Sequence, residues 1–422
     1  MRIAILTNAP APYRTPVFER IAEAPGVEAR VFFDSASASA VVDRQPGYPH
    51  EFLQPAFRLR HRNYQDDEDW AEQVSMGFAL TYLPRLASFR PDVIVSGEFG
   101  WRTLNATVYA HAAGIPLLIW WEGTRFTERR LAAIRRYSRR GLASTSAGLL
   151  GFGRGSVDYL RNIAHERTPV HFVPQAVDNE SIAEATDRWR AQRERVREQL
   201  GVRGVTLLCL SRLLPHKGIP QYVSALRRLT DAVPEGAFTA LFAGEGPEAE
   251  TIERAAKDFP RTIRNLGMVS PGEIPRLFAA SDLLVFPTLR DCWGMVVNEA
   301  LASGIPVLGS RYAGAAEELL CGEDMGRLID PLAPDSLDEA LVAAVRNAEW
   351  ASTSPTRLRA ALKGYSSEGA ADAILHAARD AIARRSRSAK SMTEAKRPDG
   401  ASGSASPDGI HRPVEKPPPY SS

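Results

Sequence analysis

The stretch DLLVFPTLRDCWGMVVNEALASGIPVLGS, residues 282–310, combines two short apolar runs with a longer segment between them. Runs such as Leu283–Phe286 are typical of buried strands, and the intervening segment is long enough for a helix that crosses over to a parallel neighbour. Asp291 precedes the expected helix, and Glu299 lies on it more than one turn further along. The stretch therefore predicts a parallel strand–helix–strand unit with an acid on each side of a helix start.

The same alternation continues toward both ends of the chain. Before residue 178 the apolar runs are RIAILTN, VEARVFF, PDVIVSGEF, IPLLIWWEG, AGLLGFG and VHFVPQ, and segments of helical period lie between them, including 103–113, 127–140 and 156–163. After residue 200 the runs are VTLLCLSRL, FTALFAG, TIRNLGMV, DLLVFPT, PVLGS and GRLID. Strands that alternate with helices predict an α/β protein in which both halves are doubly wound, Rossmann-like sheets.

The domain boundaries follow from length and composition. A chain of 422 residues exceeds the size at which one hydrophobic core keeps growing, so two domains are expected, at residues 1–177 and 201–365. The highly charged segment 178–200 predicts a connecting helix, and a further helix is expected at 366–385. Residues 386–422 are rich in Ser, Lys, Pro, Asp and Gly, which predicts a disordered tail.

The overall composition excludes several classes of protein. A formal net charge of +2 does not suggest a nucleic-acid binder. The three cysteines lack the spacing of a disulfide framework or a zinc site, which fits a reducing compartment. The first residues contain too short an apolar run for a signal peptide, and no window approaches the length of a membrane span. We therefore expect a cytoplasmic protein.

Two strand ends of the second half carry residues suited to a phosphate ligand. VTLLCLSRLLPHKG ends with Arg212 and Lys217, and these two cations together can neutralise a diphosphate. The alternative is a pair of solvated surface cations. ALFAGEGPE places Gly244 and Gly246 in a tight turn before a helix, where a ligand can approach the backbone; the glycine pair alone is weak evidence.

The third strand end is the opening stretch. If its helix begins near Gly294, the N–H groups of Gly294, Met295 and Val296 are free to bind phosphate or sugar oxygens. Asp291 can then accept hydrogen bonds from sugar hydroxyls, and Glu299 can reach the ribose diol of a nucleotide. Taken singly, Asp291 is better explained as a helix cap and Glu299 as an exposed helix acid.

Several motifs together resemble the retaining glycosyltransferases of family 4, also called glycosyl transferases group 1. They are Ser211-Arg212 through Lys217-Gly218, GEGPE at 244–248, DCWG at 291–294 with NEA at 298–300, GIPV at 304–307, APYRTPVFER at 11–20 and VPQAVDNESI at 173–182. The resemblance spans roughly residues 1–385 and is most specific in the second half. It implies two facing Rossmann-like domains, the GT-B fold, with the active site in the cleft between them.

The resemblance also implies roles for individual residues. Arg212 and Lys217 are expected to hold the donor diphosphate and Glu299 the ribose, while Asp291, Trp293 and the amides that follow contact the transferred sugar. The family usually has Glu at the first acidic position. Asp291 is one methylene shorter, which places the identity of the donor sugar in question.

The first half departs further from the family pattern. NAPAPYRTP replaces the usual glycine pair of the first loop, so Tyr13 and Arg14 are expected to face the acceptor instead. Glu122 in IPLLIWWEGT occupies the place of a histidine that many members carry, and it is a catalytic candidate; the alternative is a strand-end acid that caps the next helix. Glu98 in SGEFG is a further acceptor-side candidate.

The implied reaction is sugar transfer from a nucleotide-diphosphate-sugar to a glycan or polyprenyl-linked acceptor, with retention and without a metal or other cofactor. Two alternatives are a sugar-nucleotide epimerase of the same architecture and a noncatalytic sugar-nucleotide-binding subunit. The acidic run Asp66–Asp69 contains an Asp-x-Asp pattern, but acids before an apolar-periodic segment are better explained as a helix start than as a metal site.

One basic segment suggests a further partner. Arg125–Arg140 carries seven Arg against one Glu, and Leu131, Ile134 and Tyr137 fall on one stripe of the expected helix. This arrangement is typical of a helix that rests on anionic lipid, so a peripheral position at the inner face of the membrane is one expectation. The alternative is a solvated Arg-rich helix whose apolar stripe packs on its own sheet.

Overall fold

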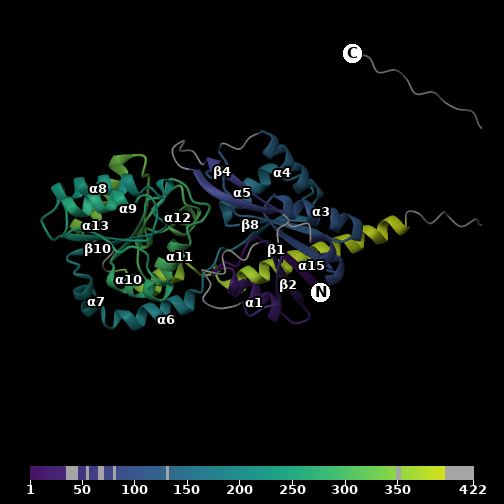
Figure 1. Ribbon diagram of the computed structural model, residues 1–422. Helices are drawn as coiled ribbons and strands as arrows, with labels where there is room; N and C mark the ends of the chain where they lie inside the picture. Colours follow the sequence, from purple (N-terminus) through teal and green to yellow (C-terminus); the bar gives the residue numbers. More distant parts are fainter. Residues whose placement is uncertain are drawn as a thin grey trace, which may run out of the picture. The chain divides into compact units, whose positions relative to one another are not determined.

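The computed structural model describes residues 1–34, 46–53, 57–64, 71–78, 82–129, 133–347 and 353–394. Met1–Ile382 form one compact unit that contains two parallel sheets, each with its own hydrophobic core (Figure 1). We call the part built on the first sheet the N-terminal lobe and the part built on the second the C-terminal lobe. The predicted α/β class with two Rossmann-like sheets is confirmed.

The N-terminal lobe has a seven-stranded sheet in the order β3-β2-β1-β6-β7-β8-β9 within the described residues. Neighbouring strands pair in parallel, for example Ile5 with Val31 and with Val95. The strands are β1 (Arg2–Thr7), β2 (Glu28–Phe33), β3 (His50–Phe52), β6 (Val93–Gly97), β7 (Leu117–Trp121), β8 (Gly148–Phe152) and β9 (Val170–Val173). A separate antiparallel hairpin consists of β4 (Phe57–Tyr64) and β5 (Ala71–Phe78).

Helices cover both faces of this sheet (Figure 1). One face packs against α2 (Tyr82–Phe89), α3 (Trp101–Ala113), α4 (Ala133–Thr145) and α5 (Arg154–Ile163). The other face packs against α1 (Thr15–Glu23) and against α15 (Ser367–Glu394), through side chains between Ala370 and Ala381. The chain therefore returns from the C-terminal lobe to complete the core of the N-terminal lobe.

The C-terminal lobe has a six-stranded parallel sheet in the order β12-β11-β10-β13-β14-β15. Counted along this lobe, that is the Rossmann order 3-2-1-4-5-6. The strands are β10 (Val205–Leu210), β11 (Phe238–Ala243), β12 (Ile263–Asn265), β13 (Leu283–Phe286), β14 (Val307–Ser310) and β15 (Gly326–Ile329). The pairing of Leu207 with Leu283 joins β10 to β13, where the strand order reverses.

The helices of the C-terminal lobe also lie on two faces. One face packs against α8 (Ile219–Ala232), α9 (Ala249–Asp258) and α13 (Pro334–Asn347). The other packs against α10 (Ile274–Ala280), α11 (Met295–Ala302), α12 (Gly314–Leu319) and α14 (Pro355–Ala360). The short 3-10 helices are η2 (Pro215–Lys217), η3 (Pro271–Glu273) and η4 (Glu323–Met325).

Three expected helices differ in extent from those observed. The segment 178–200 forms two helices, α6 (Asn179–Arg190) and α7 (Arg193–Leu200), rather than one; Asp178 caps the first by accepting from the main-chain N of Ser181 at 3.1 Å. Where a helix was expected at 127–140, the structure assigns α4 to Ala133–Thr145, and residues 125–129 form a turn in which the hydroxyl of Thr127 bonds the backbone of Thr124.

The last helix continues to Glu394, past residue 385, where the tail was expected to begin. The acidic run Asp66–Asp69 and residues 395–422 lie outside the described residues. The segment after the acidic run is the strand β5, so the helix expected there is wrong. Across the described ranges, no helix is both long enough and apolar enough to span a bilayer.

Candidate active site

The sheet topology determines where a ligand site can form. In a doubly wound sheet, the loops after the central strands diverge where the strand order reverses, and this leaves a crevice at their carboxyl ends. In the N-terminal lobe these loops follow β1 and β6, and they carry Arg14 and Glu98. In the C-terminal lobe they follow β10 and β13, and they carry Lys217 and Asp291.

A cavity of about 360 Å³ gathers residues from all four of these loops. Six of the residues predicted from the sequence line it: Arg14, Glu98, Glu122, Arg212, Lys217 and Asp291. The other lining residues are Trp120, Trp121, Gly123, Thr127, Glu128, His216, Arg290 and Cys292. Residues that are far apart in the sequence therefore meet in one polar cavity.

On the C-terminal side of the cavity, Lys217 and Asp291 form an ion pair. The Nζ of Lys217 donates to Oδ2 of Asp291 at 2.6 Å, and the two side chains are only 12% and 16% exposed. The second oxygen, Oδ1, accepts from the main-chain N of Trp293 at 3.1 Å. Both carboxyl oxygens of Asp291 are thus held in place, and Lys217 keeps further N–H donors for a ligand.

Gly244 and Gly246 shape the loop that carries Arg212. Their φ angles are +140° and +151°, and a Cβ would lie 1.9 Å from the carbonyl O of Ser211 at Gly244 and 2.3 Å from that of Leu213 at Gly246. The main-chain N of Leu213 donates to the carbonyl O of Glu245 at 2.7 Å. The glycines therefore let two loops pack backbone against backbone, and they lie behind the cavity rather than in its lining.

The start of α11 matches the expected helix terminus. Gly294 precedes Met295 with φ +95°, and a Cβ there would collide with the ring of Phe286. The first N–H groups of a helix have no acceptor within it, so those of Met295 and Val296 are available to an anion. This part of the site depends on a glycine at position 294.

Glu299 lies on α11 outside the lining of the cavity and is partly buried. Its carboxyl group has no hydrogen-bond or ion-pair partner among the described residues, and burial raises its pKa from 4.5 to about 7. An unpaired acid in such a place favours a ligand that donates hydrogen bonds.

Trp293 differs from the prediction of a donor-binding side chain. It is 4% exposed, its indole N donates to Oδ1 of Asn298 at 2.7 Å, and its ring stacks on Tyr365 at 6.0 Å between centroids. The ring also lies against Gly153, where a Cβ would come within 2.6 Å of it. Trp293 therefore joins the two lobes, and only its main chain approaches the cavity.

On the N-terminal side, Arg14 pairs with Glu122. Nη2 of Arg14 donates to Oε1 of Glu122 at 2.6 Å, and the guanidinium lies over the rings of Tyr13 and Trp120 at 5.2 and 5.0 Å. A second nitrogen, Nη1, donates to the hydroxyl of Thr7 at 3.1 Å. Glu122 is therefore fixed in the wall of the cavity by Arg14.

The two remaining acceptor-side candidates lie beside this pair. Burial raises the pKa of the Tyr13 phenol above its ordinary value, so it stays protonated. Glu98 is exposed, and its φ of +67° is unusual for a residue other than glycine. Its main-chain N donates to the carbonyl O of Trp120 at 2.9 Å, which holds this strained residue at the mouth of the cavity.

Eight lining residues were not among the predicted site residues, and His216 and Glu128 are two of them. His216 precedes Lys217, and burial together with the nearby Lys217 and Arg290 lowers its pKa to about 4, so the imidazole stays neutral. Because His216 lies between Arg212 and Lys217 in the sequence, the motif could have indicated it as a site residue. Glu128, paired with Arg139 at 2.6 Å, had no such signal because its partner lies on another element.

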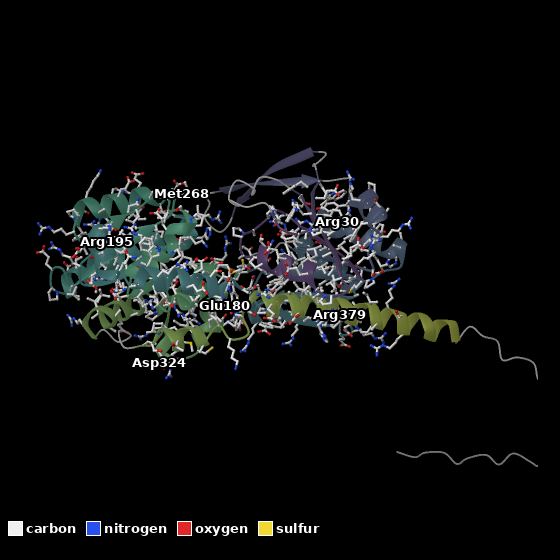
Figure 2. The ribbon with its side chains drawn as sticks, turned by 90° about the horizontal axis from the view of Figure 1, so that it is seen from below. Arg30, Glu180, Arg195, Met268, Asp324 and Arg379 are labelled. Atoms are coloured by element: carbon white, nitrogen blue, oxygen red, sulfur yellow. The ribbon has the colours of Figure 1, made fainter. Side chains whose placement is uncertain are left out.

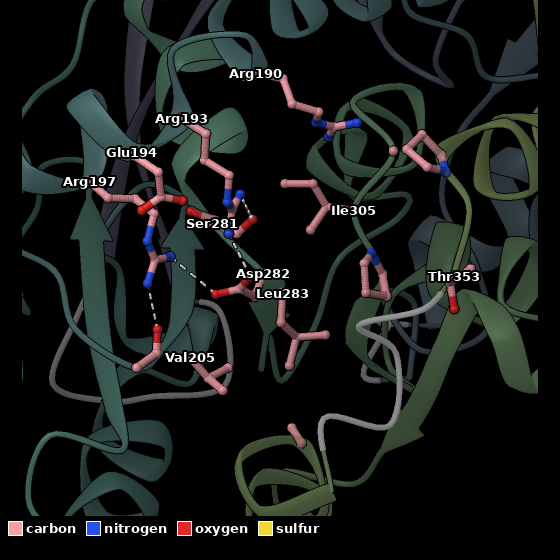
Figure 3. A pocket seen from close by; sticks show the side chains of 15 residues that line it. Arg190, Arg193, Glu194, Arg197, Val205, Ser281, Asp282, Leu283, Ile305 and Thr353 are labelled. Atoms are coloured by element: carbon pink, nitrogen blue, oxygen red, sulfur yellow. Dashed lines mark hydrogen bonds and ion pairs between the residues drawn. The ribbon is translucent and has the colours of Figure 1, made fainter.

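A larger cavity of about 580 Å³ lies at the opposite ends of the same strands, beside Val205 and Leu283 (Figure 3). Its guanidinium groups already have partners: Arg193 and Arg197 both pair with Asp282, at 2.6 and 3.3 Å, and both donate to main-chain carbonyls near the end of α10. This cavity is therefore a structural junction between α7, α10 and the sheet.

Comparisons with known proteins agree with this geometry. Residues 204–347 match the model of the family Glycosyl transferases group 1. Sulfoquinovosyl transferase of Arabidopsis thaliana is 24% identical over 285 residues, 65% of this chain and 53% of that protein. The GDP-mannose-dependent alpha-(1-6)-phosphatidylinositol monomannoside mannosyltransferase of Mycolicibacterium smegmatis is 32% identical over 179 residues, 40% of this chain and 45% of that protein. The chain thus spans about half the length of these relatives.

Solved structures match nearly the whole chain. HepE of Anabaena, solved in complex with UDP, has a TM-score of 0.67 at 17% identity and covers 93% of this chain and 100% of its own. Sucrose-phosphate synthase of Thermosynechococcus elongatus has a TM-score of 0.63 at 15% identity and covers 94% and 100%. The fold is GT-B, and residues 204–347 are similar to the group 1 glycosyltransferases.

Proposed function

We propose that the protein transfers a sugar, with retention of configuration, from a nucleotide-diphosphate-sugar to a glycan or lipid-linked acceptor. The observation that carries the proposal is the cavity in which Arg212, Lys217 and Asp291 of one lobe meet Arg14 and Glu122 of the other. The relatives are named as sugar transferases, and the mannosyltransferase is named as GDP-mannose-dependent.

The donor would bind mainly to the C-terminal lobe. Arg212 and Lys217 offset the charge of the diphosphate, and this effect grows as the leaving group takes up negative charge in the transition state. The first N–H groups of α11 contribute to the same task. Glu299 then accepts hydrogen bonds from the ribose diol, and Asp291 accepts from hydroxyls of the transferred sugar.

The acceptor would enter from the N-terminal lobe. It attacks from the face of the leaving group, and a donor phosphate oxygen takes its proton, so the protein supplies no separate base. Glu122, fixed by Arg14, orients a hydroxyl of the sugar or the acceptor. Because Arg212 and Lys217 provide the positive charge at the diphosphate, we propose that transfer needs no metal.

The test begins with donor binding. A thermal-shift screen of UDP-glucose, GDP-mannose and other nucleotide sugars should identify a ligand that stabilises the protein, by about 2.7 kcal/mol at 100 times its dissociation constant. That donor is then incubated with and without a panel of acceptors. Consumption of the donor only in the presence of an acceptor supports a transferase. Isomerisation of the donor without an acceptor supports an epimerase, and donor binding without turnover supports a noncatalytic subunit.

Two variants then test the site. Arg212→Ala and Glu299→Ala should each lower the rate of transfer by on the order of a hundredfold. The fold should be retained, because the side chain of Arg212 is exposed and the carboxyl group of Glu299 has no hydrogen-bond partner among the described residues. Glu253→Ala is the matched control, since this glutamate is exposed on α9. A wild-type rate in a folded Arg212→Ala variant would overturn the assignment.

A further inference from the structure

The helices α3 and α4 present an uncovered apolar surface. Ile134 and Tyr137 on α4 are 77% and 72% exposed. On the neighbouring α3, Trp101, Leu104 and Val108 are 36%, 44% and 54% exposed, and their spacing places them along one side of the helix. We call these five side chains the α3–α4 face.

The alternative raised by the sequence, in which the apolar stripe packs on the sheet, does not hold for Ile134 and Tyr137. A solvated Arg-rich helix that packs its apolar stripe on its own sheet would bury Ile134 and Tyr137, but the buried residue of α4 is Ala143. Leu131, the other member of the expected stripe, lies outside the described residues. Ile134 and Tyr137 therefore point away from the core, whereas Leu142 and Ala143, nearer the end of α4, pack against it.

Within α3 and α4 themselves, the charged side chains have one sign. Neither α3 nor α4 contains an Asp or Glu, and Arg135, Arg136 and Arg140 are exposed on α4. Exposed aliphatic and aromatic side chains with arginines beside them suit the boundary of an anionic bilayer, where the rings enter the headgroup region and the guanidinium groups bind phosphate.

The structure also divides the basic segment into two parts. Arg125 pairs with Glu317 at 2.9 Å, and the guanidinium of Arg129 lies over the ring of Tyr312 at 5.7 Å. Arg139 turns inward to Glu128, which lines the cavity. Among the described arginines of this segment, the outward ones of α4 are left for an external partner. The inward Arg139 joins this helix to the wall of the proposed active site.

We propose that the α3–α4 face seats the protein on an anionic phospholipid bilayer. The binding partner of the α3–α4 face is a bilayer rather than a groove on another protein, because its exposed apolar side chains are scattered and lie beside charges of one sign. The two helices contain no acid that could pair with a basic protein. The contact with the bilayer would also place the cavity beside a lipid-linked acceptor. This last statement, unlike the bilayer contact itself, rests on the proposed transferase function.

The test is cosedimentation with vesicles, without donor or acceptor. Wild-type protein should bind vesicles of phosphatidylcholine with about one quarter phosphatidylglycerol, and not phosphatidylcholine alone. Binding should weaken strongly in about 0.5 M NaCl, where the Debye length falls to a few ångströms. Equal binding to both vesicles, or none to the anionic ones, would overturn the proposal.

Variants with matched controls locate the contact. Arg135/Arg136/Arg140→Ser should lower the partition coefficient roughly a hundredfold, because each arginine near the surface contributes a factor of about five. Ile134→Ser/Tyr137→Ser should lower it about tenfold through lost apolar burial.

The controls carry equivalent changes on the C-terminal lobe, where Arg195 and Met268 lie at the surface (Figure 2). Arg188/Arg195/Arg203→Ser removes the same charge from exposed positions, and Met268→Ser/Leu332→Ser removes side chains that are 74% and 59% exposed. Both should bind vesicles like wild type. If the α4 variants bind like wild type, or the controls lose as much, the face is not the contact. Because no sugar nucleotide is present, failure of the proposed activity leaves this result unchanged.

Discussion

Donor binding should depend on pH through Glu299. The carboxyl group has a pKa of about 7 in the free protein because burial disfavours its charge. If the ribose diol needs the carboxylate as acceptor, about one tenth of the protein is competent at pH 6 and about nine tenths at pH 8. The affinity for a nucleotide sugar should therefore rise about tenfold, or about 1.4 kcal/mol, between these values.

Isothermal titration calorimetry with UDP-glucose or GDP-mannose measures this slope. A nucleotide sugar is the right probe because its diphosphate does not titrate near pH 7, whereas the terminal phosphate of UDP does. His216 does not interfere, since its pKa of about 4 leaves it neutral throughout. Glu299→Gln should abolish the slope and Glu253→Gln should keep it. A wild-type slope in Glu299→Gln, or a flat profile in the wild type, would refute the reasoning.

The same carboxyl group links pH to stability. Its pKa in the folded protein lies above the ordinary 4.5, so the folded state binds more protons between these values. The free energy of unfolding should therefore fall as the pH rises from about 4.5 to above 7, with an upper bound of about 3 kcal/mol. Urea unfolding of the wild type and Glu299→Gln at both ends of this range measures the difference.

Three further outcomes are expected. Lys217→Met should lower the free energy of unfolding by about 2 kcal/mol, because it leaves Asp291 without its ion-pair partner. The double variant Lys217→Met/Asp291→Asn should recover part of this loss. If the losses of the two single variants simply add in a double-mutant cycle, the direct pair is contradicted. Asp291→Glu should keep donor binding but change the ranking of donor sugars in initial rates, and identical profiles would show that this acid does not contact the sugar. Gly246→Ala should lower the free energy of unfolding, measured in urea, by more than about 2 kcal/mol, because the new Cβ meets the carbonyl of Leu213. In the control Gly272→Ala, the new Cβ has nothing within 4 Å, and the loss should be under about 1 kcal/mol. Similar losses in the two variants would contradict the close approach at Gly246.

The class of fold and the C-terminal half of the site could be predicted from the sequence. Apolar runs alternating with helical segments reflect side-chain periodicity, which is a local property, and so both sheets were predicted. Arg212 and Lys217 lie on one loop, and Asp291 and Glu299 lie within one strand–loop–helix unit. Each pair is close in sequence; Arg212, Lys217 and Asp291 line the same cavity, whereas Glu299 lies outside its lining.

Only the tertiary structure decided the contacts between distant segments. Arg14 meets Glu122 across 108 positions and Lys217 meets Asp291 across 74, because the loops after the central strands of both sheets converge on one cavity. Trp293 lies in a motif that predicts a donor-binding side chain, but its ring is buried against Tyr365.

Two larger features have the same origin. Nothing in the local pattern of α15 shows that it covers the sheet of the first lobe, and nothing in the pattern of α4 shows that Ile134 and Tyr137 stay exposed. An amphipathic helix carries an apolar stripe in either case, so its sequence indicates that the stripe exists, while the packing of the other elements determines what the stripe contacts.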